Sequence, residues 1–238
     1  HETGRHGPGK RFSWGGRDLT LRRGVHLRLV NVGAAPLVHS SGRLGYPVSL
    51  VTGQSRSPLA SARELEEFLR AHRERYGEEV ENVGFFADVV ADAMCLPGVA
   101  TREEAYSVLE ALRVGMSRVL EMERDDLEVL VVGRPGQDDV DAILYDPMPG
   151  GSGLLEQACE RWPEVAQAAT EVVEKCPSGC GRSCVDCLQT FRNAFYHGHL
   201  NRHVAYERLR TLGSSLTFLH EIPARLPAET PKGRTMPV

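Results

Sequence analysis

Four cysteines lie within twelve residues of this 238-residue chain, at Cys176, Cys180, Cys184 and Cys187. Their C-x3-C-x3-C-x2-C spacing keeps the thiols close enough in sequence to close one tetrahedral shell around zinc, and the glycines between them let the backbone fold back. Four thiolates leave no open coordination position, so the pattern predicts one structural Zn2+ and not a hydrolytic centre. Two disulfides, or unrelated buried thiols, are the alternatives.

The residues around this run fit the same prediction. Lys175 and Arg182 can partly neutralise the double negative charge of a zinc ion with four thiolates. The other cysteines, Cys95 and Cys159, are isolated, which is typical of metal ligation in a reducing cytoplasm. No apolar stretch approaches the roughly 18 residues of a membrane span, and no signal-peptide pattern opens the chain. We therefore expect a cytoplasmic protein with no membrane partner.

The chain can form one large domain or two small ones, and its patterns divide it into three parts. Residues 1–24 show no hydrophobic periodicity and are expected to be a flexible or edge lead-in. Residues 25–80 are expected to form a small α/β part, and residues 81–238 the zinc-binding domain. Because the chain begins at His1, we expect a piece of a longer protein, with N-terminal processing as the alternative.

Charge is segregated along the chain, whose formal net charge is −4. The first 30 residues and residues 175–210 are basic, whereas residues 61–128 are acidic. Basic ends can present a face to phosphates, but the same segregation is common on surfaces that bind protein or nothing. Charge alone therefore leaves nucleic acid as one of several possible partners.

Hydrophobic spacing predicts an α+β fold, with a mostly antiparallel or mixed sheet packed by helices and the zinc knot near the C-terminus. Ser61 with Glu64, and Thr101 with Glu104, are capping pairs that predict helix starts. The helix after Thr101 carries a long apolar stripe that is typical of core packing. The remaining expected elements are strands at 25–31, 46–51, 127–132 and 142–145, a strand or strand–helix mixture at 83–90, a helix at 154–173, and helical pieces from Val185 and Asn201.

Two glycine-containing segments invite comparison with phosphate-binding loops. Gly4 to Lys10 reads G-x4-G-K, but no strand precedes it and Arg11 replaces the Ser or Thr that would hold Mg2+, so we expect no nucleotide hydrolysis. The second segment lies between a predicted strand and a predicted helix, where it forms either an anion-binding helix start or a tight turn. Its candidate residues are Asp146, Gly150, Gly151, Ser152 and Gly153.

The segment after the cysteines interleaves aromatic residues with Arg, Asn and His, as stacking on bases and gripping phosphates would require. Phe191 and Phe195 are spaced i, i+4 and are predicted to pack in the core. His197 or His199 is an alternative metal ligand. The candidate nucleic-acid contacts are Lys175, Arg182, Arg192, Asn193, His197 and Arg202.

The order of these motifs is more informative than any one of them. AILYDPMPGGSGLLEQ is followed by CPSGCGRSCVDCLQTFRN and then by LNRHVAYERL. Over residues 80–212 this order resembles the MrfA-type zinc-binding domain at the C-terminus of DEAD/DEAH-box helicases, which is also found in DrmB proteins of DISARM systems. The resemblance implies that Cys176, Cys180, Cys184 and Cys187 are the zinc ligands.

The N-terminal third resembles the family less closely. GYPVSLVTGQSRSP is similar to a segment that often carries a second C-x2-C in such proteins, but Ser49 and Thr52 stand at those positions here. His72 and Tyr76 have the spacing of further ligands. We therefore interpret this part as a degenerate metal site.

The resemblance implies a non-catalytic accessory domain of a bacterial superfamily 2 helicase or a helicase-associated phage-defence protein, engaging DNA and chiefly single strands. The helicase motor domain would lie in the same chain or in another one. The alternative is a protein-interaction module that assembles a DISARM-type defence complex or a DNA-repair complex, with zinc purely structural. A hydrolase that uses the Asp146 loop is a third reading, and nothing in the sequence pairs a nucleophile with a base.

Overall fold

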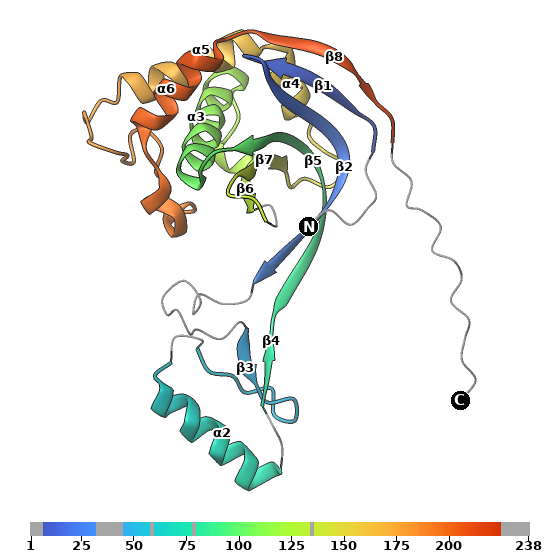
Figure 1. The fold of residues 1–238 in the computed structure, drawn as a ribbon, viewed down its shortest axis with the longest axis vertical. Helices are drawn as coiled ribbons and strands as arrows, with labels where there is room; N and C mark the ends of the chain where they lie inside the picture. The colour runs from blue at the N-terminus through green and yellow to red at the C-terminus, as the bar shows by residue number, and fades with distance from the viewer. Residues whose placement is uncertain (1–6, 32–44, 58–59, 78–79, 134–135, 225–238) are drawn as a thin grey trace. The chain divides into compact units, whose positions relative to one another are not determined.

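The computed structural model describes residues 7–31, 45–57, 60–77, 80–133 and 136–224. It forms two compact units, a smaller one at Arg28–Val89 and a larger one made of Glu2–Leu27 with Val90–Val238 (Figure 1). The boundaries fall inside two long strands, whereas the sequence patterns placed them near residues 24 and 80. A strand that serves two units has one continuous alternation of side chains, so periodicity gives no boundary signal there.

The larger unit is built on a six-stranded sheet with the strand order β6-β7-β5-β2-β1-β8. The pairs β1–β2, β1–β8, β5–β7 and β6–β7 are antiparallel. The strands are β1 (Gly9–Trp14), β2 (Arg17–Asn31), β5 (Phe85–Val99), β6 (Glu128–Gly133), β7 (Val140–Asp146) and β8 (Leu216–Ile222).

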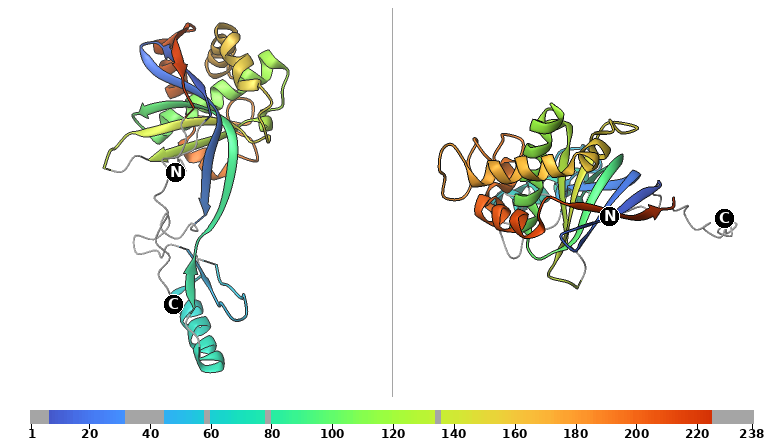
Figure 2. Two further views of the ribbon diagram at one scale, coloured as in Figure 1. Left: turned by 90° about the vertical axis from the view of Figure 1, so that its right-hand side faces the viewer. Right: turned by 90° about the horizontal axis from the view of Figure 1, so that it is seen from above.

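Helices gather on one side of this sheet, with α3 among them (Figure 2). Helix α3 begins after Thr101, whose side chain accepts the backbone N–H of Glu104, and its apolar stripe is buried as expected. This layering confirms the α+β architecture with an antiparallel sheet. The helices are α3 (Arg102–Leu120), α4 (Leu154–Glu160), α5 (Trp162–Glu174) and α6 (Arg202–Leu212), with the 3-10 turns η1 (Arg124–Asp126) and η2 (Ala194–His199).

Two expectations differ from the structure. The single helix expected at 154–173 is two helices that meet at Arg161, because Pro163 has no backbone N–H to continue the hydrogen-bond ladder of the first. The lead-in expected over residues 1–24 is ordered sheet from Gly9 onward, and β1 is paired on both sides. Its buried Trp14 donates through Nε1 to the carbonyl of Gly213 (2.7 Å) and packs edge-on against Trp162.

The smaller unit contains β3 (Tyr46–Val48) paired antiparallel with β4 (Glu81–Val83), and α2 (Ala62–Tyr76). The capping box of Ser61 and Glu64 is formed, and Gly77 ends the helix in the left-handed conformation that favours glycine. Only one face of α2 is shielded, through Phe68 and His72. Among the described residues, no helix combines the length and apolar character needed to cross a membrane.

Close packing of α3 on α5 depends on Gly115. A β-carbon built there would lie 2.5 Å from the carbonyl oxygen of Val165 and 2.9 Å from the amide nitrogen of Ala169. We predict that Gly115→Val lowers the free energy of unfolding by about 1–3 kcal/mol, because the backbones must separate. Denaturant unfolding measures this, with Gly198→Val as the control, since a β-carbon there meets nothing within 4 Å. Equal midpoints for both variants would contradict this account of the interface.

Candidate metal centre

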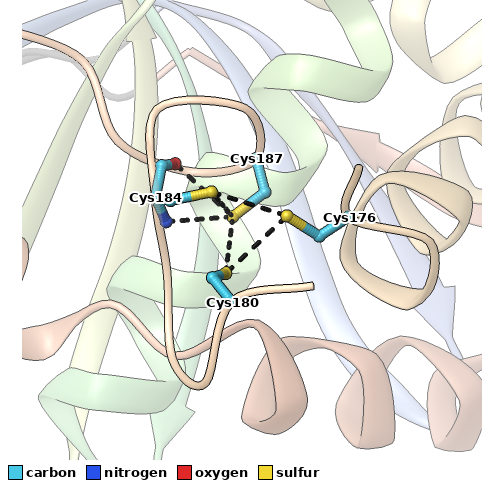
Figure 3. Close-up of side chains that lie close together, drawn as sticks. All are labelled: Cys176, Cys180, Cys184 and Cys187. Carbon is cyan, nitrogen blue, oxygen red and sulfur yellow. Dashed lines mark hydrogen bonds between the residues drawn. The ribbon is translucent and has the colours of Figure 1, made fainter. Parts of the chain in front are cut away.

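The four cysteine thiols converge after the end of α5 (Figure 3). The Sγ–Sγ distances are 3.7 Å for Cys176–Cys180, 3.5 Å for Cys176–Cys184, 3.7 Å for Cys180–Cys187 and 3.8 Å for Cys184–Cys187. A tetrahedral zinc ion with Zn–S bonds of about 2.3 Å separates its sulfur ligands by about 3.8 Å. A disulfide would need about 2.05 Å. The geometry therefore fits four thiolates around one metal ion.

Two tight turns produce this convergence. Gly179 has a positive φ of 53° and donates its N–H to the carbonyl of Cys176 (2.9 Å), which reverses the chain after the first ligand. At the second turn, the N–H of Cys187 donates to the carbonyl of Cys184 (3.1 Å), and the N–H of Cys184 points at Cys187 Sγ (3.2 Å). Backbone N–H groups aimed at sulfur stabilise the thiolate form that a metal requires.

The thiols differ in their readiness to ionise without metal. Burial opposes ionisation of Cys176, but hydrogen bonds from the backbone N–H of Cys180 and from the Cys184 thiol lower its pKa to about 7. Burial raises the pKa of Cys187 to about 12. A metal ion must therefore displace the proton of Cys187 on binding, and zinc supplies the charge that compensates a buried thiolate.

Arg202 fastens the metal centre to the end of α5. Its guanidinium donates from Nε to the carbonyl of Cys180 (2.7 Å) and from NH1 to the carbonyl of Val173 (2.8 Å). Its backbone N–H donates to the carbonyl of Arg182 (2.6 Å). The bond to Val173 satisfies a carbonyl that the end of α5 leaves without an intrahelical partner, and the other two bonds hold the cysteine loop. Arg202 is half-buried and has this structural role, and its predicted contact with nucleic acid stays a prediction.

A buried carboxylate ties the centre to the core. Glu110 on α3 is fully buried and accepts from the Tyr196 hydroxyl, while Arg113 and Arg124 lie 3.4 Å and 3.6 Å from its oxygens. Arg124 also donates to the carbonyl of Leu188 (3.2 Å), directly after the last cysteine. Sequence reasoning missed this network, although a glutamate inside the buried stripe of α3 is a signal that could have found it.

The predicted nucleic-acid residues do not share one environment. Asn193 is 1% exposed, accepts from the N–H of Thr190 (2.7 Å) and donates to the carbonyl of Leu188 (2.8 Å). His197 Nε2 lies 2.7 Å from Asn193 Oδ1. Both side chains therefore brace the loop after the knot, and the surface role predicted for Asn193 is wrong because it is buried.

The remaining cations of the predicted set are on the surface. Lys175 is exposed, Arg182 donates to Glu103 (2.6 Å), and Arg192 donates to Asp125 (2.9 Å). Exposed ion pairs of this kind contribute about 0–1 kcal/mol, so a competing anion can replace the carboxylate at little cost.

The two phenylalanines after the knot are solvent-exposed, not core. Phe191 is 96% exposed and Phe195 83% exposed. The prediction of core packing was wrong because i, i+4 spacing brings side chains together only on a helix. Here the segment has no regular helix and only the 3-10 turn η2, so Asn193 and Tyr196 turn inward while the two phenylalanines do not.

In the glycine loop after β7, the side chain of Asp146 already accepts the hydrogen bonds that a phosphate would need. Asp146 is 1% exposed and accepts from the N–H groups of Met148 and Ser152 and from the Ser152 hydroxyl. Gly151 has a φ of 77°, and a β-carbon there would collide with the Asp92 carboxylate. The candidates Gly150 and Gly153 also have positive φ angles. Two carboxylates against the loop disfavour phosphate, and burial leaves Asp146 without access to a substrate.

Ser49, Thr52 and His72 come together in the smaller unit as a hydrogen-bonded turn against α2. The N–H of Thr52 donates to Ser49 Oγ (3.0 Å), and Thr52 Oγ1 lies 3.4 Å from His72 Nε2. His72 Nδ1 lies 3.0 Å from the carbonyl of Phe68 and donates to it, since a carbonyl oxygen only accepts. The ring of Tyr76 lies 5.6 Å from that of His72. Serine and threonine hydroxyls are not the usual zinc ligands.

Comparison with known proteins identifies the segment around the four cysteines. Residues 108–188 match the family model described as MrfA Zn-binding domain. The expected MrfA-type zinc-binding domain is thereby confirmed over these residues, which include all four cysteines. With the converging thiols, this match supports a single structural zinc ion.

Two curated relatives are similar to part of the chain. Over 111 residues it is 31% identical to Druantia protein DruE of Escherichia coli (strain UMEA 4076-1), covering 44% of this chain and 6% of that protein. Over 100 residues it is 32% identical to the uncharacterized ATP-dependent helicase YprA of Bacillus subtilis (strain 168), covering 38% of this chain and 13% of that protein.

A crystal structure of the DUF1998 helicase MrfA bound to DNA matches with a TM-score of 0.44 and 14% identity, over 82% of this chain and 22% of that one. The matches thus span only 6% and 13% of the curated relatives' lengths.

The metal centre yields a first test. We predict that Cys180→Ser lowers zinc below one ion per chain and raises hydrogen exchange over residues 174–200, because metal binding and local folding are coupled. Metal analysis and hydrogen exchange measure this, with Cys159→Ala as a control that keeps its zinc. An unchanged metal content and melting temperature in Cys180→Ser would contradict the assignment of a zinc site to these cysteines.

The turn in the smaller unit yields a second test. Ser49 is fully buried, so Ser49→Ala leaves the N–H of Thr52 without its acceptor. We expect the stability of this unit to fall by about 1–3 kcal/mol while zinc remains at one ion per chain. Ser55→Ala, an exposed neighbour, should change neither. Loss of zinc from Ser49→Ala would show that this turn holds metal after all.

Proposed function

We propose that this chain is a non-catalytic, zinc-stabilised accessory domain that engages single-stranded DNA. It belongs to a bacterial superfamily 2 helicase or to a helicase-associated phage-defence protein, with the motor domain in the same chain or in another. Cys176, Cys180, Cys184 and Cys187 are its zinc ligands. The match to the MrfA Zn-binding domain and the resemblance to a protein named as an ATP-dependent helicase support this context.

The observation that carries the proposal is the pair of exposed aromatic rings beside the metal centre. Phe191 and Phe195 are 96% and 83% exposed, and Arg192 between them is also exposed. Stacking of a base on an aromatic ring contributes about 1–3 kcal/mol and needs a base face that a duplex hides. The arrangement therefore favours single strands over duplex.

The metal centre holds these rings in place through a short chain of hydrogen bonds. Leu188 follows the last cysteine and accepts from Arg124 and from Asn193. Asn193 in turn fixes the N–H of Thr190, just before Phe191. Zinc thereby acts on DNA binding by positioning, without touching the strand.

Surface cations near the metal centre in sequence supply the phosphate contacts. Lys175 is exposed, and the ion pairs of Arg182 with Glu103 and of Arg192 with Asp125 lie on the surface. Each phosphate that replaces a carboxylate releases counterions, so affinity falls with salt.

A protein-interaction module is the second candidate. Val185, between the last two zinc ligands, is 71% exposed, and Phe191 and Phe195 are exposed apolar residues of the same segment. A subunit of a DISARM-type defence complex or a DNA-repair complex could cover that surface. Co-elution with a helicase partner, without salt-sensitive DNA binding, would favour this candidate.

Replacing the two rings tests the proposal. We predict that Phe191→Ala with Phe195→Ala weakens binding to a labelled single strand at least about tenfold, because two stacking contacts are lost. Phe218→Ala on β8, which removes a ring that is 51% exposed, should bind as the unaltered chain does. Fluorescence anisotropy over a salt series measures both affinity and salt slope.

The slope of log affinity against log salt concentration distinguishes a loss of base stacking from a loss of phosphate contacts. It should stay the same in the double phenylalanine variant and become shallower by about 0.7 in Arg192→Gln, since one single-strand phosphate contact is lost. Unchanged affinity in the double variant, with zinc still bound, would contradict the aromatic contact.

A further inference from the structure

A pocket of about 320 Å3 opens beside Phe195, between the segment after the metal centre and the start of β6. Its volume lies at the lower end of the roughly 300–1,000 Å3 of small-molecule sites, so it suits a single ring system. Its apolar walls include Phe195 and the buried Tyr196, and its polar ones include Arg113, Asp125, Glu128 and Arg192. No role in the fold or in the metal centre accounts for it.

The charges of the pocket are balanced. Two arginines are offset by two carboxylates, so a phosphate entering the pocket would meet repulsion as well as attraction. A neutral group with hydrogen-bond donors and acceptors can donate to the carboxylates and accept from the arginines. The edges of nucleobases are neutral and carry hydrogen-bond donors and acceptors side by side.

The carboxylate of Asp125 is well placed to accept from such a group. Its Oδ1 lies 3.6 Å from Arg113 NH2 and its Oδ2 lies 2.9 Å from Arg192 Nε. The Arg192 side chain is 68% exposed and Asp125 is 42% exposed, so their bond is weak and can be exchanged for one to a ligand. An amino group can then take the place of Arg192 on Oδ2.

Arg113 offers an independent indication of a missing acceptor. It is 4% exposed, and its Nε and NH2 atoms find no hydrogen-bond acceptor among the residues that the structure describes. Unfilled donors on a buried guanidinium cost free energy, which an entering carbonyl or ring nitrogen would recover. Arg113 lines the pocket, so an acceptor that enters the pocket approaches these donors.

We propose that this pocket receives one unstacked base of a bound single strand and favours a base with an exocyclic amino group over thymine. The ring stacks on Phe195, the amino group donates to Asp125, and the adjacent ring nitrogen or carbonyl accepts from Arg113. In the same orientation thymine places its O4 carbonyl against the carboxylate and its N3–H against the Arg113 donors, so both contacts are lost. This inference rests on the proposed function and adds base preference to it.

Cytosine and thymine homopolymers test the preference without an ambiguity of register. Anisotropy at neutral pH should give at least about fivefold tighter binding of oligo-dC than of oligo-dT, both of about 12 nucleotides. Asp125→Ala should bring the ratio of the two affinities close to one. Asp125→Asn keeps the side-chain shape and should reduce the ratio as well, which covers the case in which the alanine variant fails to fold.

Phe195→Ala and Phe218→Ala complete the design. Phe195→Ala should weaken both strands and lower the dC/dT ratio, whereas Phe218→Ala should change neither. If the unaltered chain binds the two strands with equal affinity, the proposal of a base-selective pocket is wrong, whereas the proposal of single-strand binding is not contradicted. Failure of both strands to bind would overturn single-strand binding and the pocket together.

Discussion

Four sulfur atoms within 4.8 Å of one another are the constraint on which the surface around them depends. The segment from Cys176 to Leu200 has no strand and no regular α-helix, so it cannot be held by a hydrogen-bond ladder of its own. Metal ligation closes it, and Arg202 and Arg124 fasten its carbonyls to α5 and to the buried Glu110. The free energy of zinc binding is thus the folding energy of the segment that presents the aromatic rings.

The buried charges set a second condition. Glu110 is completely shielded, and removing either arginine beside it would leave its charge with only one cationic partner in a medium of low dielectric. The same network reaches outward from Arg113 through Asp125 to the exposed Arg192. A ligand that binds at Asp125 therefore competes with a surface ion pair while the inner pairs remain in place, which keeps the cost of binding low.

Much of the scaffold was predictable because its signals are local. Capping residues placed the starts of α2 and α3, and cysteine spacing gave the convergent thiols. The failures have physical causes. The i, i+4 spacing of Phe191 and Phe195 indicated a buried helix face, but the chain there is irregular and Asn193 is the residue that turns inward. The structural role of Arg202 was missed because sequence does not show which carbonyls a helix end leaves open. The Asp125 pocket needs residues far apart in sequence, which no spacing reveals.

The central claim is that zinc positions the aromatic segment for single-stranded DNA, and stepwise metal removal tests it directly. Zinc would be titrated away with a chelator while single-strand binding is followed by anisotropy and the helical signal of α3 and α5 by circular dichroism. The account predicts that DNA affinity falls in proportion to zinc while the helical signal is largely retained. DNA binding that persists undiminished in the metal-free, folded chain would contradict it.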